Sequence, residues 1–72
     1  MSRCPVLSDV SGAVWKILVS VGDTVAEYQE LMLIESMKME IPVLAPRDGR
    51  VAELLVGEGD AVAAEQIVAW ID

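Results

Sequence analysis

The sequence contains no histidine and only one cysteine, Cys4, among its 72 residues. Without histidine the chain lacks the commonest general base and every Ser-His or Cys-His nucleophile pair. A single cysteine excludes an internal disulfide, and the missing histidine further excludes the usual zinc ligand sets. We therefore expect a chain that is not an enzyme by itself and that works in a reducing compartment, the cytoplasm.

Basic residues are also scarce, with five Lys and Arg against twelve Asp and Glu, and they form no cluster. The formal net charge of −7 argues against nucleic acid as a partner, because phosphate binding needs Lys and Arg to displace counterions. An anionic membrane surface is disfavoured for the same reason. The longest apolar runs, such as IVAWI, fall far short of the roughly 20 residues that a spanning helix needs.

Hydrophobic residues make up 54% of the chain, so it should fold rather than stay disordered. We expect one domain over residues 1–72, a length that buries about 60% of the unfolded surface.

The chain repeats itself at a spacing of 37 residues. When residues 12–35 are laid over residues 49–72, 10 of the 24 aligned pairs are identical, including a Gly-Asp pair at 22–23 and 59–60. Two units are too few for a solenoid. The repeat predicts a single core built from two halves, about 12–35 and 49–72, related by a pseudo-twofold axis and joined by a hairpin around residues 35–41.

Both halves read as β-strands. AVWKILV (13–19) and RVAELLV (50–56) alternate imperfectly, contain β-branched residues and are followed by Gly-Asp turns. With CPVL (4–7) and EIPVLA (40–45), about eight short strands are expected. The fold class predicted from this spacing is all-β, a β-sandwich or flattened barrel. Trp15 and Trp70 are expected to pack in its core or at the rim.

The junction between the two halves reads ESMKME, residues 35–40. It lies between two apolar runs, where a turn is expected, yet it contains no Gly, Asn, Asp or Pro. With Met37 and Lys38 as the two central residues of a hairpin, both need a positive φ, which is strained for these side chains. Glu35 would then face Glu40, an unfavourable like-charge pair. Several unfavourable local features within a few residues, such as these strained φ angles and this like-charge pair, are expected at functional sites.

Pro42 has no backbone N–H to donate to a β-ladder. The strand that contains it is therefore expected to be an edge strand or to have a bulge at this position. The tip of the hairpin would present the amine of Lys38 from a rigid scaffold. A primary amine so placed can be acylated by another enzyme, and Met37 and Met39 could pack against the acyl group. The alternative from residue statistics is a solvated surface lysine.

These residues carry a resemblance to a known family. ESMKME is similar to the Glu-Ala/Ser-Met-Lys-Met signature of biotinyl domains, and the flanking GAVWKILVSVGDTV and IPVLAPRDGRVAELLVGEGDAVAAEQIVAWID resemble the two halves of that family. The resemblance covers about residues 5–72. It implies a flattened barrel of two four-stranded antiparallel sheets, with the modified lysine on a tight turn at one end.

The resemblance also implies a function, that of a biotin carboxyl carrier with biotin bound covalently to Lys38. A biotin protein ligase would attach the biotin, which would then shuttle carboxylate between a biotin carboxylase and a carboxyltransferase. Met37 and Met39 would help to bind the cofactor, and Glu35 and Glu40 would be recognised by the ligase.

Three alternatives stay open. Lipoyl carriers share the architecture, so a lipoyl carrier, or a dual carrier of biotin and lipoate, is the first alternative, although the lysine of lipoyl carriers usually sits beside Asp and Ala rather than between methionines. An unmodified interaction module of the same fold is the second alternative. The third is an enzyme that uses Lys38 to form an imine, which would need a desolvated pocket around the amine.

Overall fold

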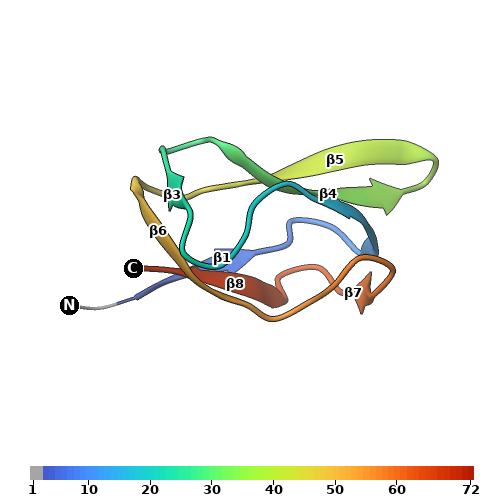
Figure 1. Ribbon diagram of the computed structural model, residues 1–72. Helices are drawn as coiled ribbons and strands as arrows, with labels where there is room; N and C mark the ends of the chain where they lie inside the picture. The colour runs from blue at the N-terminus through green and yellow to red at the C-terminus, as the bar shows by residue number, and fades with distance from the viewer. Residues whose placement is uncertain (1–2) are drawn as a thin grey trace.

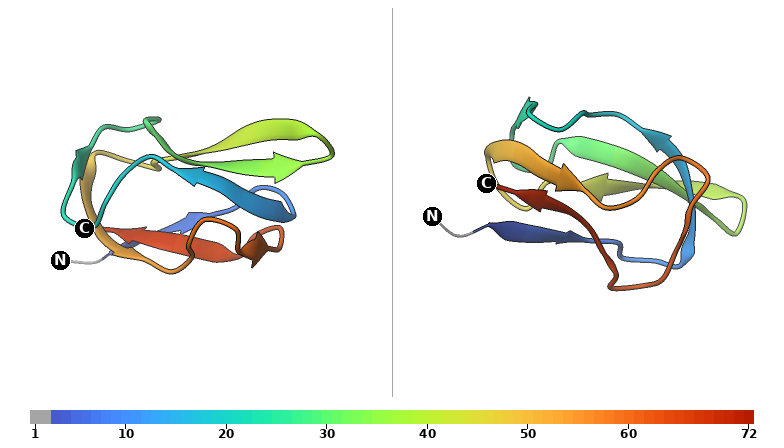
Figure 2. Two further views of the ribbon diagram at one scale, coloured as in Figure 1. Left: turned by 45° about the vertical axis from the view of Figure 1, so that its right-hand side comes forward. Right: turned by 60° about the horizontal axis from the view of Figure 1, so that its bottom comes forward.

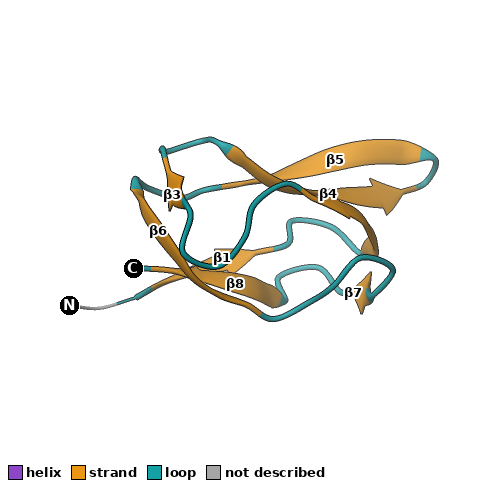
Figure 3. Ribbon diagram, in the orientation of Figure 1, coloured by secondary structure: helices purple, strands orange, loops and turns teal. Residues whose placement is uncertain are grey.

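The computed structural model describes residues 3–72, so Met1 and Ser2 of the domain expected over residues 1–72 lie outside it. The described residues form eight strands and no helix, which confirms the all-β prediction (Figure 3). The strands are β1 (Cys4–Leu7), β2 (Gly12–Ile17), β3 (Thr24–Val25), β4 (Glu30–Ser36), β5 (Met39–Leu44), β6 (Gly49–Leu54), β7 (Ala61–Val62) and β8 (Ile67–Ile71). Within residues 3–72 there is accordingly no helix of the length and apolarity needed to span a membrane.

The strands form two four-stranded antiparallel sheets that face each other, as expected (Figure 1). One sheet has the order β1-β8-β6-β3 and the other the order β5-β4-β2-β7. The molecule is elongated, with extents of 36 × 18 × 17 Å. The β4–β5 hairpin projects from one end, whereas Cys4 and Asp72 lie at the opposite end in both views of Figure 2.

The core lies between the two sheets and is made of the inward-facing residues of each strand. One face of β2 and of β4 is buried, because successive side chains point to opposite sides of a sheet, although a bulge interrupts the alternation once in each strand. Fully or almost fully buried side chains include Val6, Val14, Leu31, Met32, Ile34, Val43, Val51, Val68 and Ile71.

A shift of 37 residues relates each strand of the first half of the chain to a strand of the second half. The shift takes β1 to β5, β2 to β6, β3 to β7 and β4 to β8, so the order of one sheet becomes the order of the other. The repeat therefore extends over residues 4–35 and 41–72, because β1 and β5 also correspond. Between these halves remain only residues 36–40, the tip of the projecting hairpin.

The backbone hydrogen bonds outside the ladders obey the same shift. Tyr28 donates its backbone N–H to the carbonyl of Ala45 over 2.8 Å, and Glu65 donates its own to Ser8 over 2.6 Å. Tyr28 and Glu65 each have a φ of 69°, a left-handed conformation that the sequence did not predict for these residue types. Both halves thus have the same turns as well as the same strands.

Gly12 allows β2 to pass close to the end of β4. A Cβ at this position would collide with the carbonyl oxygen of Glu35 and would lie 2.9 Å from the Cγ2 of Ile34. Gly49 meets Asp72 and Ile71 in the same way in the other half. The base of the projecting hairpin therefore depends on the missing side chain of Gly12.

We predict that Gly12→Ala lowers the free energy of unfolding by about 1–3 kcal/mol, because the added methyl group must displace the backbone of Glu35. Urea denaturation followed by tryptophan fluorescence measures the change. Gly57→Ala is the matched control, since a Cβ there would meet only Asp60 Oδ2 at 3.8 Å. Equal stability of the Gly12→Ala protein and the wild type would contradict the prediction.

Candidate functional site

The β4–β5 hairpin turns over two central residues, Met37 and Lys38. Ser36 pairs with Met39 and Glu35 with Glu40, which confirms the predicted register. Met37 has a φ of 53° and Lys38 a φ of 65°. Positive φ at both central positions is the pattern of a type I′ turn, the turn that matches the twist of a two-residue hairpin. The predicted left-handed backbone is therefore present at both residues.

Pro42 lies in β5, which is the edge strand of its sheet, as its missing N–H predicted. It pairs with Leu33 of β4. An edge position lets the proline face outward without removing a ladder bond that a central strand would need.

The hairpin extends past the core. Ile34 is fully buried, its partner Ile41 is only half-buried, and the residues beyond them are largely outside the core. From Ile34 to the turn is a rise of about 10 Å at the usual spacing of a strand. At the tip Met37 is 91% exposed and Met39 is 62% exposed. Lys38 is also exposed.

The hairpin separates the candidate residues into three groups. Glu35 and Glu40 pair with each other on the outer face of the sheet, where Ala13 of β2 is the next residue across. Met39 lies on the opposite face of the hairpin, because it is one residue from Glu40. Met37 and Lys38 form the turn itself. The sequence thus placed these five residues on one hairpin, but they do not converge on one point.

Among residues 3–72, no hydrogen bond or ion pair joins the ammonium group of Lys38 to another side chain, whereas Arg3 forms ion pairs with Glu53 and Asp72. The amine projects into solvent from a convex tip. This position gives an acylating enzyme direct access to Nζ. It lacks the enclosed, desolvated surroundings that an imine-forming lysine requires.

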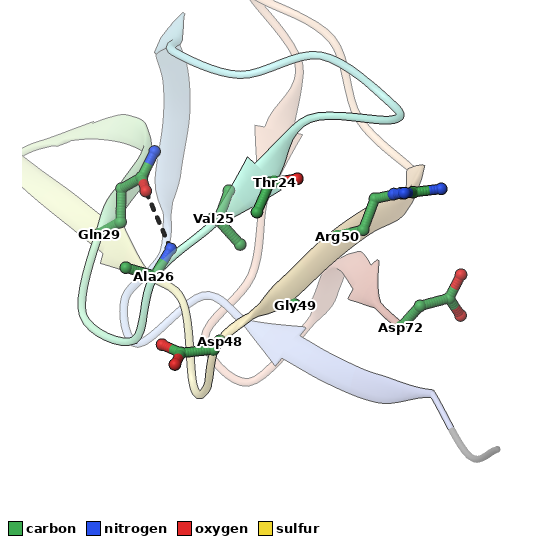
Figure 4. A pocket seen from close by; sticks show the side chains of 8 residues that line it. All are labelled: Thr24, Val25, Ala26, Gln29, Asp48, Gly49, Arg50 and Asp72. Atoms are coloured by element: carbon green, nitrogen blue, oxygen red, sulfur yellow. Dashed lines mark hydrogen bonds between the residues drawn. The ribbon is translucent and has the colours of Figure 1, made fainter.

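An open hollow lies at the other end of the molecule, near Asp72. It is an open depression of about 740 Å³. As Figure 4 shows, its lining residues come from β3 and β6, the turns beside them and Asp72 after β8, and Gln29 Oε1 accepts the backbone N–H of Ala26 over 3.0 Å. The lining consists of Thr24, Val25, Ala26, Gln29, Asp48, Gly49, Arg50 and Asp72. None of the predicted site residues lies there.

The tip fits the covalent attachment of an acyl group. Nζ of Lys38 is accessible, the turn that carries it is fixed by the ladder below, and two flexible thioether side chains flank it. Within the described residues no cluster of His, Cys, Asp and Glu could hold a metal ion. The arrangement presents a group to other proteins rather than enclosing a substrate.

Comparisons with known proteins agree with this geometry. A biotin carboxyl carrier protein from Streptococcus mutans is 62% identical over 29 residues, which cover 40% of this chain and 22% of that protein. A biotin/lipoyl attachment protein from Bacillus subtilis is 48% identical over 33 residues, covering 46% of this chain and 45% of that protein. Both alignments thus span less than half of the relative.

Solved structures give matches over the whole fold. A region of the urea carboxylase of Kluyveromyces lactis superimposes with a TM-score of 0.94 and 35% identity, covering 100% of this chain and 6% of that one. A single-chain, multi-domain long-chain acyl-CoA carboxylase matches with a TM-score of 0.86 and 21% identity over 96% of this chain and 7% of its own, a likeness of fold. The family model described as "Biotin-requiring enzyme" matches residues 3–71, and the chain therefore belongs to the biotin/lipoyl attachment family.

Proposed function

We propose that this chain is a biotin carboxyl carrier and that Lys38 bears the biotin through an amide bond between Nζ and the biotin carboxyl group. The observation that carries the proposal is the exposed amine at the tip of a hairpin that projects beyond the core. When bound, biotin supplies the chemistry, accepting carboxylate at one enzyme and releasing it at another. The chain itself supplies neither acid nor base and is not a catalyst.

The carrier would meet three protein partners. A biotin protein ligase would modify Lys38, and a biotin carboxylase and a carboxyltransferase would each receive the loaded tip. Confinement beside both active sites raises the effective concentration of the attached group, as with any tether. Met37 and Met39 would contact the biotin group, and Glu35 and Glu40 would be recognised by the ligase. The cytoplasm, a reducing compartment, suits the free thiol of Cys4.

Lipoate is the second candidate for the group on Lys38, because one relative is named a biotin/lipoyl attachment protein. The two methionines beside the lysine favour biotin. The third candidate is an unmodified interaction module, which the absence of any modification of Lys38 would favour.

We predict that Lys38→Arg abolishes biotinylation and leaves the fold unchanged, because arginine keeps the charge and the exposure but offers no acylable amine. Intact-mass spectrometry after co-expression with a biotin protein ligase measures the modification. Lys16→Arg is the control and should take up one biotinyl group like the wild type.

Each result of this experiment bears on the proposal. Biotin mapped to Lys16 in the wild-type protein would refute the assignment of the site. A lipoyl group added by a lipoate ligase, with no biotin added by the biotin ligase, would show that the group on Lys38 is lipoate and not biotin. No mass increase with either ligase would favour the interaction module.

We also predict that Glu40→Lys slows biotinylation about five- to tenfold without unfolding the domain, since a reversed charge beside the tip costs roughly 1 kcal/mol of binding. Relief of the like-charge pair with Glu35 should slightly raise the thermal midpoint. Glu27→Lys, an equal charge change in the turn beside the far hollow, is the control for net charge. Equal biotinylation rates for Glu40→Lys and the wild type would refute a role for Glu40.

The turn itself yields another prediction. Met37→Asn should raise the free energy of unfolding by roughly 1 kcal/mol, because asparagine tolerates a positive φ better than methionine. Biotinylation should become slower in the same protein, since the methionine side chain is lost from the tip. Met39→Asn, the same exchange at a strand position, should give no such gain, because asparagine is disfavoured in strands.

Chemical denaturation and a ligase time course measure the two effects separately. A destabilised Met37→Asn protein would show that the left-handed backbone at this position is not strained.

A further inference from the structure

The outer face of the sheet that carries Lys38 exposes an apolar surface. Val14 and Ile34 point into the core, so the residues next to them point outward. A bulge between Val14 and Lys16 sets Trp15 and Lys16 together opposite Leu33. The residues that share this outward face form what we call the outer patch, made of Trp15, Leu33, Pro42 and Leu44.

The patch is more exposed than the fold requires. Trp15 is 47% exposed and Leu44 is 41% exposed, while Leu33 and Pro42 are half-buried. In the other half of the repeat the position of Trp15 is taken by Ala52, so the fold forms equally well without a tryptophan there. Exposed tryptophan next to other apolar side chains is the composition typical of an interaction hot spot.

Charged residues surround the patch with one predominant sign. Glu30 pairs with Leu44 at one side, and Glu35 pairs with Glu40 at the side nearer the tip. Lys16 is the only cation of β2, β4 and β5 next to them. A complementary partner has an apolar centre with basic residues around it.

Two edge strands, one from each sheet, disfavour the addition of a further strand on this side of the molecule. β5 and β1 are both edge strands, and they carry Pro42 and Pro5 at equivalent positions of the repeat. A hollow of about 300 Å³ lies between these edges and is lined in part by both prolines and by Leu44. Proline removes the N–H that a new strand would pair with. A partner on this side is therefore bound by side chains.

The patch and the tip lie on the same sheet, and Leu33, Pro42 and Leu44 of the patch belong to the hairpin that carries Lys38. From Lys38 to the row of Leu33 and Pro42 is four residues of strand, a rise of about 13 Å. A protein that takes the Lys38 amine into its active site and contacts Glu35 and Glu40 must cover the outer face at this point. The patch is thus continuous with the candidate site.

We propose that the outer patch is the docking surface for the biotin protein ligase, a proposal that rests on the proposed function of Lys38. The ligase acts before any cofactor is attached, so it has only the protein surface by which to recognise the domain and to choose Lys38 over Lys16. A carboxylase, in contrast, can bind the biotin group itself. The ligase surface that fits has an apolar groove with basic residues along its rim.

Steady-state biotinylation of the purified, unmodified domain tests this proposal. Trp15→Ser should raise the KM for the domain about tenfold with little change in kcat, as expected when binding common to ground and transition states is lost. Trp15→Phe keeps an aromatic contact and should restore a KM near that of the wild type. Leu55→Ser is the matched control, because Leu55 is 45% exposed and follows β6 in the other sheet.

An unchanged KM for Trp15→Ser overturns the proposal, even if a later carboxylation step is impaired. A KM raised equally by Leu55→Ser overturns it as well, since the effect would then not be specific to the patch. In both cases the wild-type domain is still biotinylated on Lys38, so the proposed function stands. Absence of biotin on wild-type Lys38 would instead overturn the function.

A second measurement leaves the outer patch unsubstituted. Titration of the isotopically labelled Lys38→Arg domain with the ligase should shift the backbone amide NMR signals of Trp15, Lys16 and Leu33 together with those of the tip. The amides of β6 and β8 should not move. Shifts confined to residues 36–40 would overturn the docking surface, because the ligase would then touch only the turn.

Discussion

The presentation of Lys38 depends on the burial of Ile34. A two-stranded hairpin is at best marginally stable in water when it stands alone, and beyond the pair of Glu35 and Glu40, which still lies beside Ala13 of β2, no third strand pairs with this hairpin. Ile34 is fully buried between the sheets, and its neighbour Gly12 lets β2 approach the carbonyl of Glu35. Burial of one such side chain stabilises by about 1.5–3 kcal/mol, comparable with the strain of about 1–3 kcal/mol for a left-handed residue such as Met37. Burial of Ile34 in the core thus stabilises a turn conformation that Met37 and Lys38 do not favour by themselves.

The pseudo-twofold arrangement explains why this turn is free to serve chemistry. Ile71 and Gly49 occupy in one half the places of Ile34 and Gly12 in the other, so the core is complete within residues 4–35 and 41–72. The tip adds residues 36–40 to a core that does not need their side chains. Residue types at the turn are consequently not constrained by packing. Met37 and Lys38 can stand where asparagine and glycine would give the more stable hairpin.

Much of this could be predicted from the sequence, because a two-residue turn over Met37 and Lys38 fixes the pairs of β4 and β5 from the tip down to Met32 and Val43, where a bulge shifts the register. Pro42 likewise indicated an edge strand, since it has no N–H to donate. The sequence did not reveal the full repeat: Pro-Val-Leu occurs at residues 5–7 and 42–44 with the same spacing of 37, but lies outside the aligned segments 12–35 and 49–72. Nor did it place Trp15, because the bulge beside Val14 interrupts the alternation from which a facing direction is inferred. The left-handed Tyr28 gave no signal, as its conformation comes from the tertiary bond to Ala45.

A carrier must leave each partner as readily as it binds, and this limits how strong the outer patch can be. Amide formation at Lys38 would remove the one cation of the tip and leave Glu35 and Glu40, so a ligase with a basic rim would attract the product more strongly than the substrate. Release of the product then requires that apolar contacts with the outer patch contribute little to the binding free energy. Four side chains, two of them already half-buried, provide limited area, as in the small interfaces of transient complexes. Under the proposed function, a patch of this modest size would therefore let the same tip, once loaded, pass to the next enzyme.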